Sequence, residues 1–544
     1  MGKKASPDTK SPEDTRPMQV ADKGQAGDKP DKQFNMGIVI PLVFVSMAGW
    51  MFGADTGTIS GLTQMADYQQ RFGVARGDGT YYFDPPRQGL VVGMVNAGTF
   101  FGCLLSAYPT ERFGRRKSIM GWCLVYFLGL TLQLTAVNTW VHVMIARIIT
   151  GLSIGALTVN APSYQSELAP KAIRGAIVCT FQLFVTLGIF AGYLINYGTY
   201  RTENEASWRV PIAINFLWGI FLAVGMIFLP ESPARLYKMK DEEGCKKVLA
   251  KIRGTDVSDP NVEADFEEIK EAVHKETEGG PSKWKDVFHK DVRYRTFLGI
   301  AVMSFQQLVG ANFFFYFGTS TFTEVNIAQN YVAQIILGAV NFGCTFAGLY
   351  ILERFGRRWP LIIGALWMCL CLLIFASVGH FKIALAADPT TERTSGIVLI
   401  VFTCLYIAAF STTWAPAAYV IVGESFPLRV RAKCAALSTA ANFFWGFLIT
   451  FFTGFIVEAI DYRYGYVFAA CSIIAALIIF FFAMETKGLS LEEIDAMYHS
   501  GIKAWQSEGF AKKLQEEREG KEKKDEEEGL TKGERESAQP REVQ

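Results

Sequence analysis

Twelve long runs of mostly uncharged residues occupy this chain, and their length restricts its fold more than any other feature. Each run has about 18 to 25 residues, enough for a helix to cross a hydrocarbon layer roughly 30 Å thick. In lipid, only helices and closed barrels satisfy their own backbone hydrogen bonds, and barrel strands would be shorter and alternating. The sequence therefore predicts an all-α membrane protein with twelve transmembrane helices. The runs lie near residues 37–60, 88–109, 118–136, 141–163, 175–197, 208–229, 296–318, 330–352, 360–379, 397–423, 433–457 and 464–484.

Two repeated motifs indicate that one half of the chain is a copy of the other. The pentapeptide Arg-Phe-Gly-Arg-Arg stands at 112–116 and again at 354–358, each time directly after a glutamate. A second pattern, Glu with Pro three residues on and Arg seven residues on, stands at 167–174 and 424–431. A unit of about 250 residues is far longer than a solenoid repeat. We expect two pseudo-symmetric bundles of six helices each.

The polar segments between and around the apolar runs divide the chain into five regions. Both ends are highly charged and poor in large apolar residues, which predicts disorder, whereas the central polar stretch has apolar residues at helical spacing. The expected regions are a disordered N-terminus (1–35), a first bundle (36–229), a linker with short helices (230–295), a second bundle (296–484) and a mostly disordered C-terminal tail (485–544).

The positions of lysine and arginine predict how the protein sits in its membrane. Basic residues gather in the loops after the second, eighth and tenth runs, whereas the loop at 137–140 has none. Basic loops face the cytoplasm. With an even number of spans both termini would be cytoplasmic, and we expect a multi-pass plasma-membrane protein.

Charge and cysteine usage exclude several functions. The formal net charge is only +1, and the charges stand in blocks, so no basic face is offered to nucleic acid. The ten cysteines are scattered, with no Cys-x-x-Cys pair, which argues against a metal site. No nucleophile, base and orienting group stand together, and no phosphate-binding glycine loop appears. We expect neither an enzyme nor a bound cofactor.

The repeated arginine clusters have two interpretations. They could simply hold their loops on the cytoplasmic side, but that does not explain why Phe-Gly and the glutamate recur too. Alternatively, the glycine permits a tight turn while the arginines pair with Glu167 and Glu424 at the ends of neighbouring spans. Such pairs would form in one conformation and break in another, and would act as a latch that stabilises an outward-open state.

Two ionisable residues stand inside predicted spans, where an unpaired charge costs about 2.5 to 3.5 kcal/mol or more. They are Asp55 and Arg147, which could pair within the first half. Asp55 could be a proton-binding carboxylate, or a permanently ionised partner of Arg147. The residues alone leave both possibilities open.

Neutral amides in the spans indicate what is carried. Gln306, Gln307 and Asn312 form a cluster, and Gln182, Asn341 and Asn442 mark other spans. Amides both donate and accept hydrogen bonds, as hydroxyl groups do, whereas a charged solute would call for a charge of opposite sign. The pattern favours a neutral, polyhydroxylated solute. Pro416 should bend its helix and provide a hinge beside the site.

At these residues the chain resembles the sugar porter family of the major facilitator superfamily, and among its members the fungal hexose transporters. The resemblance covers about residues 36 to 498. It rests on the two arginine motifs, Pro230-Glu-Ser-Pro-Ala-Arg235, Gln306-Gln307 with Asn312, and Met484-Glu-Thr-Lys-Gly488. The last motif has methionine where proline is usual, and Tyr419 stands where many relatives have tryptophan.

The resemblance implies roles for particular residues. It implies an outer gate at Tyr316, and a pair linked to proton coupling at Asp55 and Arg147. Residues implied to bind the hexose are Gln182, Gln306, Gln307, Asn312, Asn341, Tyr419 and Asn442. Residues implied to form the cytoplasmic latch are Arg115, Arg116, Glu167, Arg174, Glu353, Arg357, Arg358, Glu424 and Arg431.

The function expected from the resemblance is transport of glucose or a related hexose by alternating access, through facilitated diffusion. The partners are then the hexose and the lipid bilayer. One alternative is a proton-hexose symporter that uses Asp55, in which case protons are a further partner. Another is a glucose sensor that does not transport, although such relatives have far longer cytoplasmic tails.

Overall fold

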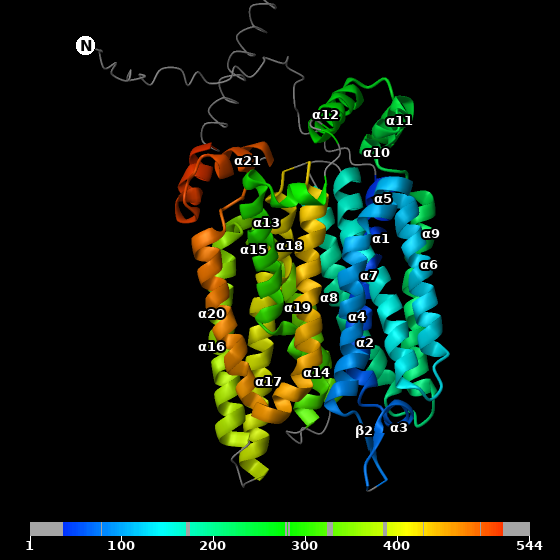
Figure 1. The fold of residues 1–544 in the computed structure, drawn as a ribbon, viewed down its shortest axis with the longest axis vertical. Helices are drawn as coiled ribbons and strands as arrows, with labels where there is room; N and C mark the ends of the chain where they lie inside the picture. The colour runs from blue at the N-terminus through cyan, green and yellow to red at the C-terminus, as the bar shows by residue number, and fades with distance from the viewer. Residues whose placement is uncertain are drawn as a thin grey trace, which may run out of the picture.

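Long helices build almost the whole molecule. The computed structural model describes residues 36–514 except 78, 170–173, 278–279, 281–282, 324–329, 384–388, 428 and 490. Within these residues the strands are β1 (Val74–Ala75) and β2 (Tyr81–Tyr82), which form one short antiparallel hairpin. Figure 1 shows the long helices running side by side in two groups, one for each half of the chain. The predicted all-α membrane fold with two six-helix bundles is confirmed.

The first group holds the predicted spans one to six, with a short helix, α3 (Ala66–Phe72), beside the hairpin. Its other helices are α1 (Met36–Val45), α2 (Met47–Leu62), α4 (Pro85–Leu105), α5 (Ala107–Phe113), α6 (Arg115–Leu134), α7 (Trp140–Leu168), α8 (Arg174–Thr199) and α9 (Ala206–Phe228).

The second group repeats this arrangement, with two spans broken in the middle. Its helices are α13 (Lys290–Leu308), α14 (Ala311–Thr323), α15 (Asn330–Phe355), α16 (Arg358–Val378), η3 (Gly379–Ile383), α17 (Pro389–Thr412), α18 (Trp414–Glu424), α19 (Arg431–Ile460), η4 (Asp461–Arg463) and α20 (Tyr464–Phe482).

The apolar stretches of the described residues agree with twelve crossings. Eleven stretches are long and apolar enough to span a membrane, and the last, Arg431–Phe482, contains both α19 and α20. These two helices are joined by the turn η4 and run in opposite directions (Figure 1), so this stretch accounts for two spans.

The linker and the start of the tail lie at one end of the bundles, beside the two Arg-Phe-Gly-Arg-Arg turns (Figure 1). We call this the basic end, and the opposite end, with α3 and the hairpin, the far end. The linker holds α10 (Pro233–Lys238), α11 (Glu242–Arg253), α12 (Pro260–Thr277) and η2 (Trp284–Phe288). The second group begins at Lys290 and not at 296, because the first turns of α13 are charged and so extend beyond the apolar run.

The first part of the C-terminal tail, up to residue 514, is mostly helical. It contains α21 (Leu491–His499) and η5 (Ala504–Gln506), and helix continues to residue 514. Few apolar residues are needed to hold it, since Ile494 and Met497 are buried and Asp495 pairs with the buried Arg295 of α13 at 2.6 Å. Residues 1–35 and 515–544, where disorder is also expected, lie outside the described residues.

Glycines let the helices of the first half approach closely. Gly53 and Gly57 of α2 face α8, and a methyl group added there would lie 2.0 Å from the Val185 carbonyl oxygen and 2.4 Å from that of Ile189. Gly98 of α4 lies equally close to the Ile148 carbonyl of α7. In lipid, helices associate mainly by such close packing of small residues. The glycines therefore hold each half together as a compact body.

The two groups meet most extensively along two pairs of helices, and α2 also contacts α14. α4 lies against α19, where the Asn96 amide donates to Thr450 at 3.3 Å, and α8 lies against α15, where Thr345 donates to Thr186 at 3.3 Å. These pairs flank a central space lined by side chains from both groups.

Candidate functional site

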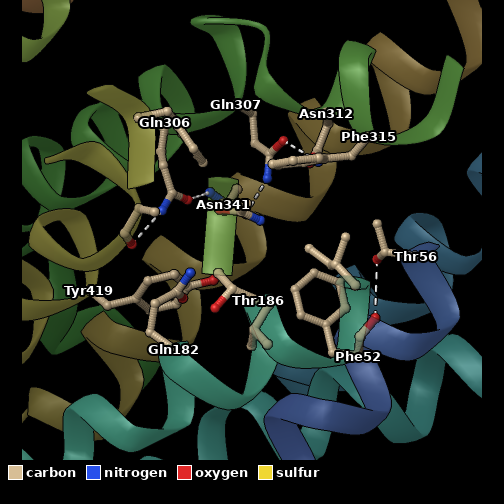
Figure 2. Close-up of a pocket in the computed structure, with 15 residues that line it drawn as sticks. Phe52, Thr56, Gln182, Thr186, Gln306, Gln307, Asn312, Phe315, Asn341 and Tyr419 are labelled. Carbon is tan, nitrogen blue, oxygen red and sulfur yellow. Dashed lines mark hydrogen bonds between the residues drawn. The ribbon is translucent and has the colours of Figure 1, made fainter. Parts of the chain in front are cut away.

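A pocket of about 500 Å³, its opening included, lies between the two groups of helices (Figure 2). All seven side chains predicted to bind the solute line it, and none of its lining side chains is charged. The lining consists of Phe52, Thr56, Gln182, Val185, Thr186, Ile189, Gln306, Gln307, Asn312, Phe315, Asn341, Phe410, Ala415, Tyr419 and Asn442.

Four amides on the second-half side of the pocket form one chain of hydrogen bonds. The Asn442 amide nitrogen donates to Gln306 at 2.6 Å, and Gln307 donates to the Asn442 oxygen at 2.8 Å. Asn312 in turn donates to the Gln307 oxygen at 2.6 Å. Asn442 thus joins both glutamines, and Figure 2 shows the dashed bonds crossing the upper wall of the pocket.

Two helix breaks place these amides. Gly310 separates α13 from α14 with φ +96°, a conformation that L side chains rarely adopt. The second break, between α17 and α18, lies at Thr413, next to the predicted bend at Pro416. The Gln306 nitrogen donates to the carbonyls of Trp414 and Ala415 at 3.3 and 3.1 Å. An amide that lines the pocket thus also binds the first turn of α18.

The first half contributes a less connected wall. The Gln182 amide points into the pocket (Figure 2) and has no hydrogen-bond partner within the described part of the chain. Beside it, Thr186 is bonded to Thr345 of the other half. A bound solute could therefore use the free amide of Gln182 without first displacing a protein group.

Tyr316, the predicted outer gate, is buried directly beside the pocket. Its hydroxyl lies 3.3 Å from the hydroxyl of Thr56, which lines the pocket and belongs to the first half. α14 carries Tyr316 and begins after the break at Gly310. The contact therefore joins the two halves on the far-end side of the amide chain.

Asp55 and Arg147 form the ion pair that the sequence suggests. Two guanidinium nitrogens donate to the two carboxylate oxygens at 3.4 and 3.2 Å, and both side chains are almost fully buried. The pair joins α2 to α7 inside the first half, outside the pocket lining. A buried pair of this kind is costly to break from one side only, because the remaining charge stays out of water.

At the basic end of the first half, a carboxylate holds the arginine turn. Gly114 has φ +90°, and the next backbone N–H, of Arg115, donates to Glu231 at 2.9 Å. The Arg115 side chain pairs with Glu167 at 2.9 Å, as predicted. Glu231 thus lies at the N-terminus of α6, where negative charge is favourable.

The second half repeats this geometry. Gly356 has φ +86°, the backbone N–H groups of Arg357 and Arg358 donate to Glu485 at 3.0 Å, and Arg357 pairs with Glu424 at 2.9 Å. The same ion pair and the same carboxylate contact therefore occur in both halves, which is strong evidence of the internal repeat.

Other members of the predicted latch have different partners. Arg116 donates to the carbonyls of Met226 and Ile227, Arg358 donates to that of Phe480, and Arg431 donates to that of Gly423. These contacts, like the two ion pairs, lie within one half. Glu353 is exposed and forms no ion pair with the described side chains, and the side chain of Arg174 lies outside the described residues.

An ion pair that was not expected from the sequence joins the halves at this end. Lys433 of α19 lies 3.3 Å from Glu111 of α5. Glu111 is the glutamate before the first arginine motif and corresponds to Glu353 in the repeat. The repeat marks both glutamates alike, so the sequence does not identify the pair itself. Glu231 and Glu485 were likewise quoted in their motifs without a role.

No group of three or more His, Cys, Asp or Glu side chains that could hold a metal ion occurs within the described residues. The polar and aromatic groups that line the pocket are amides, hydroxyls and aromatic rings. These groups can bind a neutral solute by hydrogen bonds and by contact with its C–H faces.

Comparison with known proteins decides the family. Residues 42–498 match the family model described as sugar (and other) transporter. The chain belongs to this sugar transporter family. The sugar transporters of known sequence that it resembles include a high-affinity fructose transporter of Schizosaccharomyces pombe, 54% identical over 86% of this chain and 88% of the relative. The resemblance expected from the motifs is confirmed.

The chain is also similar to other sugar transporters. A high-affinity glucose transporter of Schizosaccharomyces pombe is 50% identical, covering 90% of this chain and 92% of the relative. A low-affinity glucose transporter of Saccharomyces cerevisiae is 41% identical, covering 86% and 82%. The structure of the proton:xylose symporter XylE bound to 6-bromo-6-deoxy-D-glucose has a TM-score of 0.70 at 24% identity, covering 86% of this chain and all of that chain. This structural likeness shows the major facilitator fold.

Proposed function

We propose that this protein transports glucose or a related hexose across the plasma membrane by alternating access. The observation that carries the proposal is the uncharged, amide-lined pocket enclosed by both halves of the molecule. A hexose presents hydroxyl groups that donate and accept, and the amides of Gln182, Asn312 and Asn341 can match them. The relatives' names, which include fructose, glucose and gluconate transporters, support a sugar-like solute.

The hexose site consists of the seven residues predicted for it, and the second-half amide chain would exchange bonds with the sugar. Each hydrogen bond between two amides would be replaced by a hydrogen bond to a sugar hydroxyl. The net free energy gained on binding the sugar is therefore modest. A carrier needs this balance, since a pocket that held sugar tightly would also release it slowly. No chemical bond changes during the cycle.

Alternating access would follow from movement of the two halves about the pocket. Contacts between halves exist on both sides of it, at Tyr316 and Thr56 toward the far end and at Lys433 and Glu111 at the basic end. Breaking one set while keeping the other would open the pocket to one side. The ion pair of Lys433 with Glu111, which joins the halves at the basic end, would stabilise the state that is open at the far end.

The basic end faces the cytoplasm in this proposal, because arginine and lysine gather in its loops. The far end, with the hairpin and α3, then faces outward. Both chain termini would lie in the cytoplasm, since the described chain begins and ends at the basic end (Figure 1).

Facilitated diffusion is the preferred mode, and symport with protons is the second candidate. The buried pair of Asp55 and Arg147 favours the latter, because protonation of Asp55 would break a bond between α2 and α7. In a facilitator the same pair would stay ionised throughout the cycle.

Uptake of radiolabelled glucose by the purified protein in liposomes tests the proposal, with and without an inward proton gradient. Equilibration in both conditions is the expected result. Accumulation above the outside concentration only with the gradient would establish the symporter. Binding without uptake of glucose, fructose or any other hexose would contradict the transport proposal.

A further inference from the structure

The far end carries a second set of contacts between the halves, beyond Tyr316. Tyr331 stands in the first turn of α15 and its hydroxyl donates to the Gly61 carbonyl, near the end of α2, at 3.1 Å. Its ring stacks on that of Tyr200, after the end of α8, with 4.5 Å between centroids and 26° between planes. One side chain of the second half therefore contacts two elements of the first.

These two elements are fixed to each other. The Asn196 amide of α8 donates to the carbonyls of Gly57 and Thr58 on α2, at 3.1 and 2.8 Å. It lies so close to Gly61 that a methyl group on that glycine would be 2.4 Å from the amide nitrogen. The ends of α2 and α8 therefore move as one unit, and Tyr331 binds that unit from the other half.

The hydrogen bond of Tyr331 can break without leaving a buried group unsatisfied. The Gly61 carbonyl also accepts the backbone N–H of Gln64 at 3.0 Å, and a carbonyl oxygen has two lone pairs. Tyr331 is only partly buried, so its hydroxyl can bond to water once it separates from α2. Such a bond suits a contact that forms and breaks in every cycle.

The position of Tyr331 differs from that of the predicted gate. Tyr316 contacts Thr56, which lines the pocket, whereas Tyr331 contacts α2 five residues further toward the far end and does not line the pocket. We propose that Tyr331 is a second gating residue, which stabilises closure of the far end without contacting the sugar. This inference rests on the proposed alternating access.

The substitution Tyr331→Phe removes the hydroxyl and keeps the ring. Loss of one neutral hydrogen bond should raise the population open at the far end by roughly two- to tenfold. The measurement is the rate at which a membrane-impermeant maleimide, added outside intact cells, modifies a cysteine placed in the pocket at Ile189. The same variants without that cysteine supply the background from the native thiols.

Tyr197→Phe is the matched control. Tyr197 lies in the last turn of α8, three residues before Tyr200, and its ring contacts that of Tyr200 at 5.6 Å. Within the described residues it makes no hydrogen bond or ring contact with the second half. Its variant should label at the rate of the parent. Tyr331→Ala, which also loses the stacking on Tyr200, should label faster than Tyr331→Phe.

An unchanged labelling rate in Tyr331→Phe, or an equal increase in Tyr197→Phe, would overturn the gating role. The labelling rates are compared in the absence of sugar, so the outcome is separate from the test of transport. If hexose altered neither uptake nor labelling in any variant, the transport proposal would fail while the comparison of Tyr331 with Tyr197 would still stand.

Discussion

Lys433 and Glu111 join the two halves at the basic end across 3.3 Å, although they stand 322 residues apart in the chain. Lys433 is largely buried, but the Glu111 side chain is 67% exposed. Exposed ion pairs contribute about 0.2–1 kcal/mol. Glu111→Gln should therefore increase opening at the basic end by less than about fivefold.

Exchange of the two charges tests this pair directly. The double variant Glu111→Lys with Lys433→Glu should regain the parent's accessibility from the cytoplasmic side, measured by labelling of a pocket cysteine in inside-out vesicles. Additive effects of the two single substitutions would show that the pair does not connect the halves.

Gln306→Ala should weaken hexose binding. It removes the acceptor for Asn442 and the donor to two carbonyls at the helix break, so the Michaelis constant for uptake should rise about tenfold or more. Gln133→Ala is the control, because Gln133 is a buried amide that bonds Thr150 outside the pocket. An unchanged constant in a correctly folded Gln306→Ala protein would count against the assigned site.

Asp55→Asn should destabilise the protein, because it leaves the buried Arg147 without a counter-charge. Breaking such a pair from one side commonly costs about 3–5 kcal/mol. Thermal unfolding of the purified protein should show a clear fall in Tm, and Asp55→Asn combined with Arg147→Gln should recover part of it. Parent-like stability of the single variant would mean that the pair is not ionised in the folded state.

Gly114→Ala and Gly356→Ala should each destabilise the basic end by about 1–3 kcal/mol. Both glycines have positive φ, and an added methyl group would lie 2.6 Å from a carboxylate oxygen of Glu231 or Glu485. Gly121→Ala is the control, because a methyl group there meets no atom within 4 Å. The measurement is the Tm of each of the three variants. Equal Tm values would show that a side chain at Gly114 or Gly356 causes no strain.

Cys245 in the linker helix α11 should resist alkylation. Burial raises the pKa of its thiol to about 11, so the thiol stays protonated at neutral pH, where the thiolate is the reactive form. Maleimide labelling of this residue, followed by mass spectrometry, should be more than about a hundredfold slower than for an exposed thiol of ordinary pKa. Fast labelling of the folded protein would show that α11 is not packed as described.

The sequence predicts the helices well because an apolar run long enough to cross the membrane has to form a helix. The repeated motifs predict the two arginine turns for a similar reason, since identical local sequences adopt the same turn at Gly114 and Gly356. The pocket residues could be named because amides are rare and costly in apolar spans, which makes Gln306 and Asn442 conspicuous.

The sequence does not predict contacts between residues that are far apart in the chain and stand in no distinctive motif. Glu111 and Glu353 look equivalent in the sequence, yet Glu111 alone has an ion-pair partner among the described side chains, because Lys433 stands opposite it. Tyr331 is one aromatic residue among many, and only its contacts with Gly61 of α2 and with Tyr200 distinguish it. The helices in the first part of the tail were not predicted, because a few buried side chains and one ion pair, Arg295 with Asp495, are sufficient to order them.

In the chain of amides from Gln306 through Asn442 and Gln307 to Asn312, the polar side chains of the wall already form hydrogen bonds with one another. An arriving hydroxyl would replace an existing partner and would not fill a vacancy, and a departing one would leave its amide with a ready substitute. Empty and loaded forms of the wall would then differ little in free energy. A carrier built this way can return without cargo almost as readily as with it, which is the condition for net flow down a gradient.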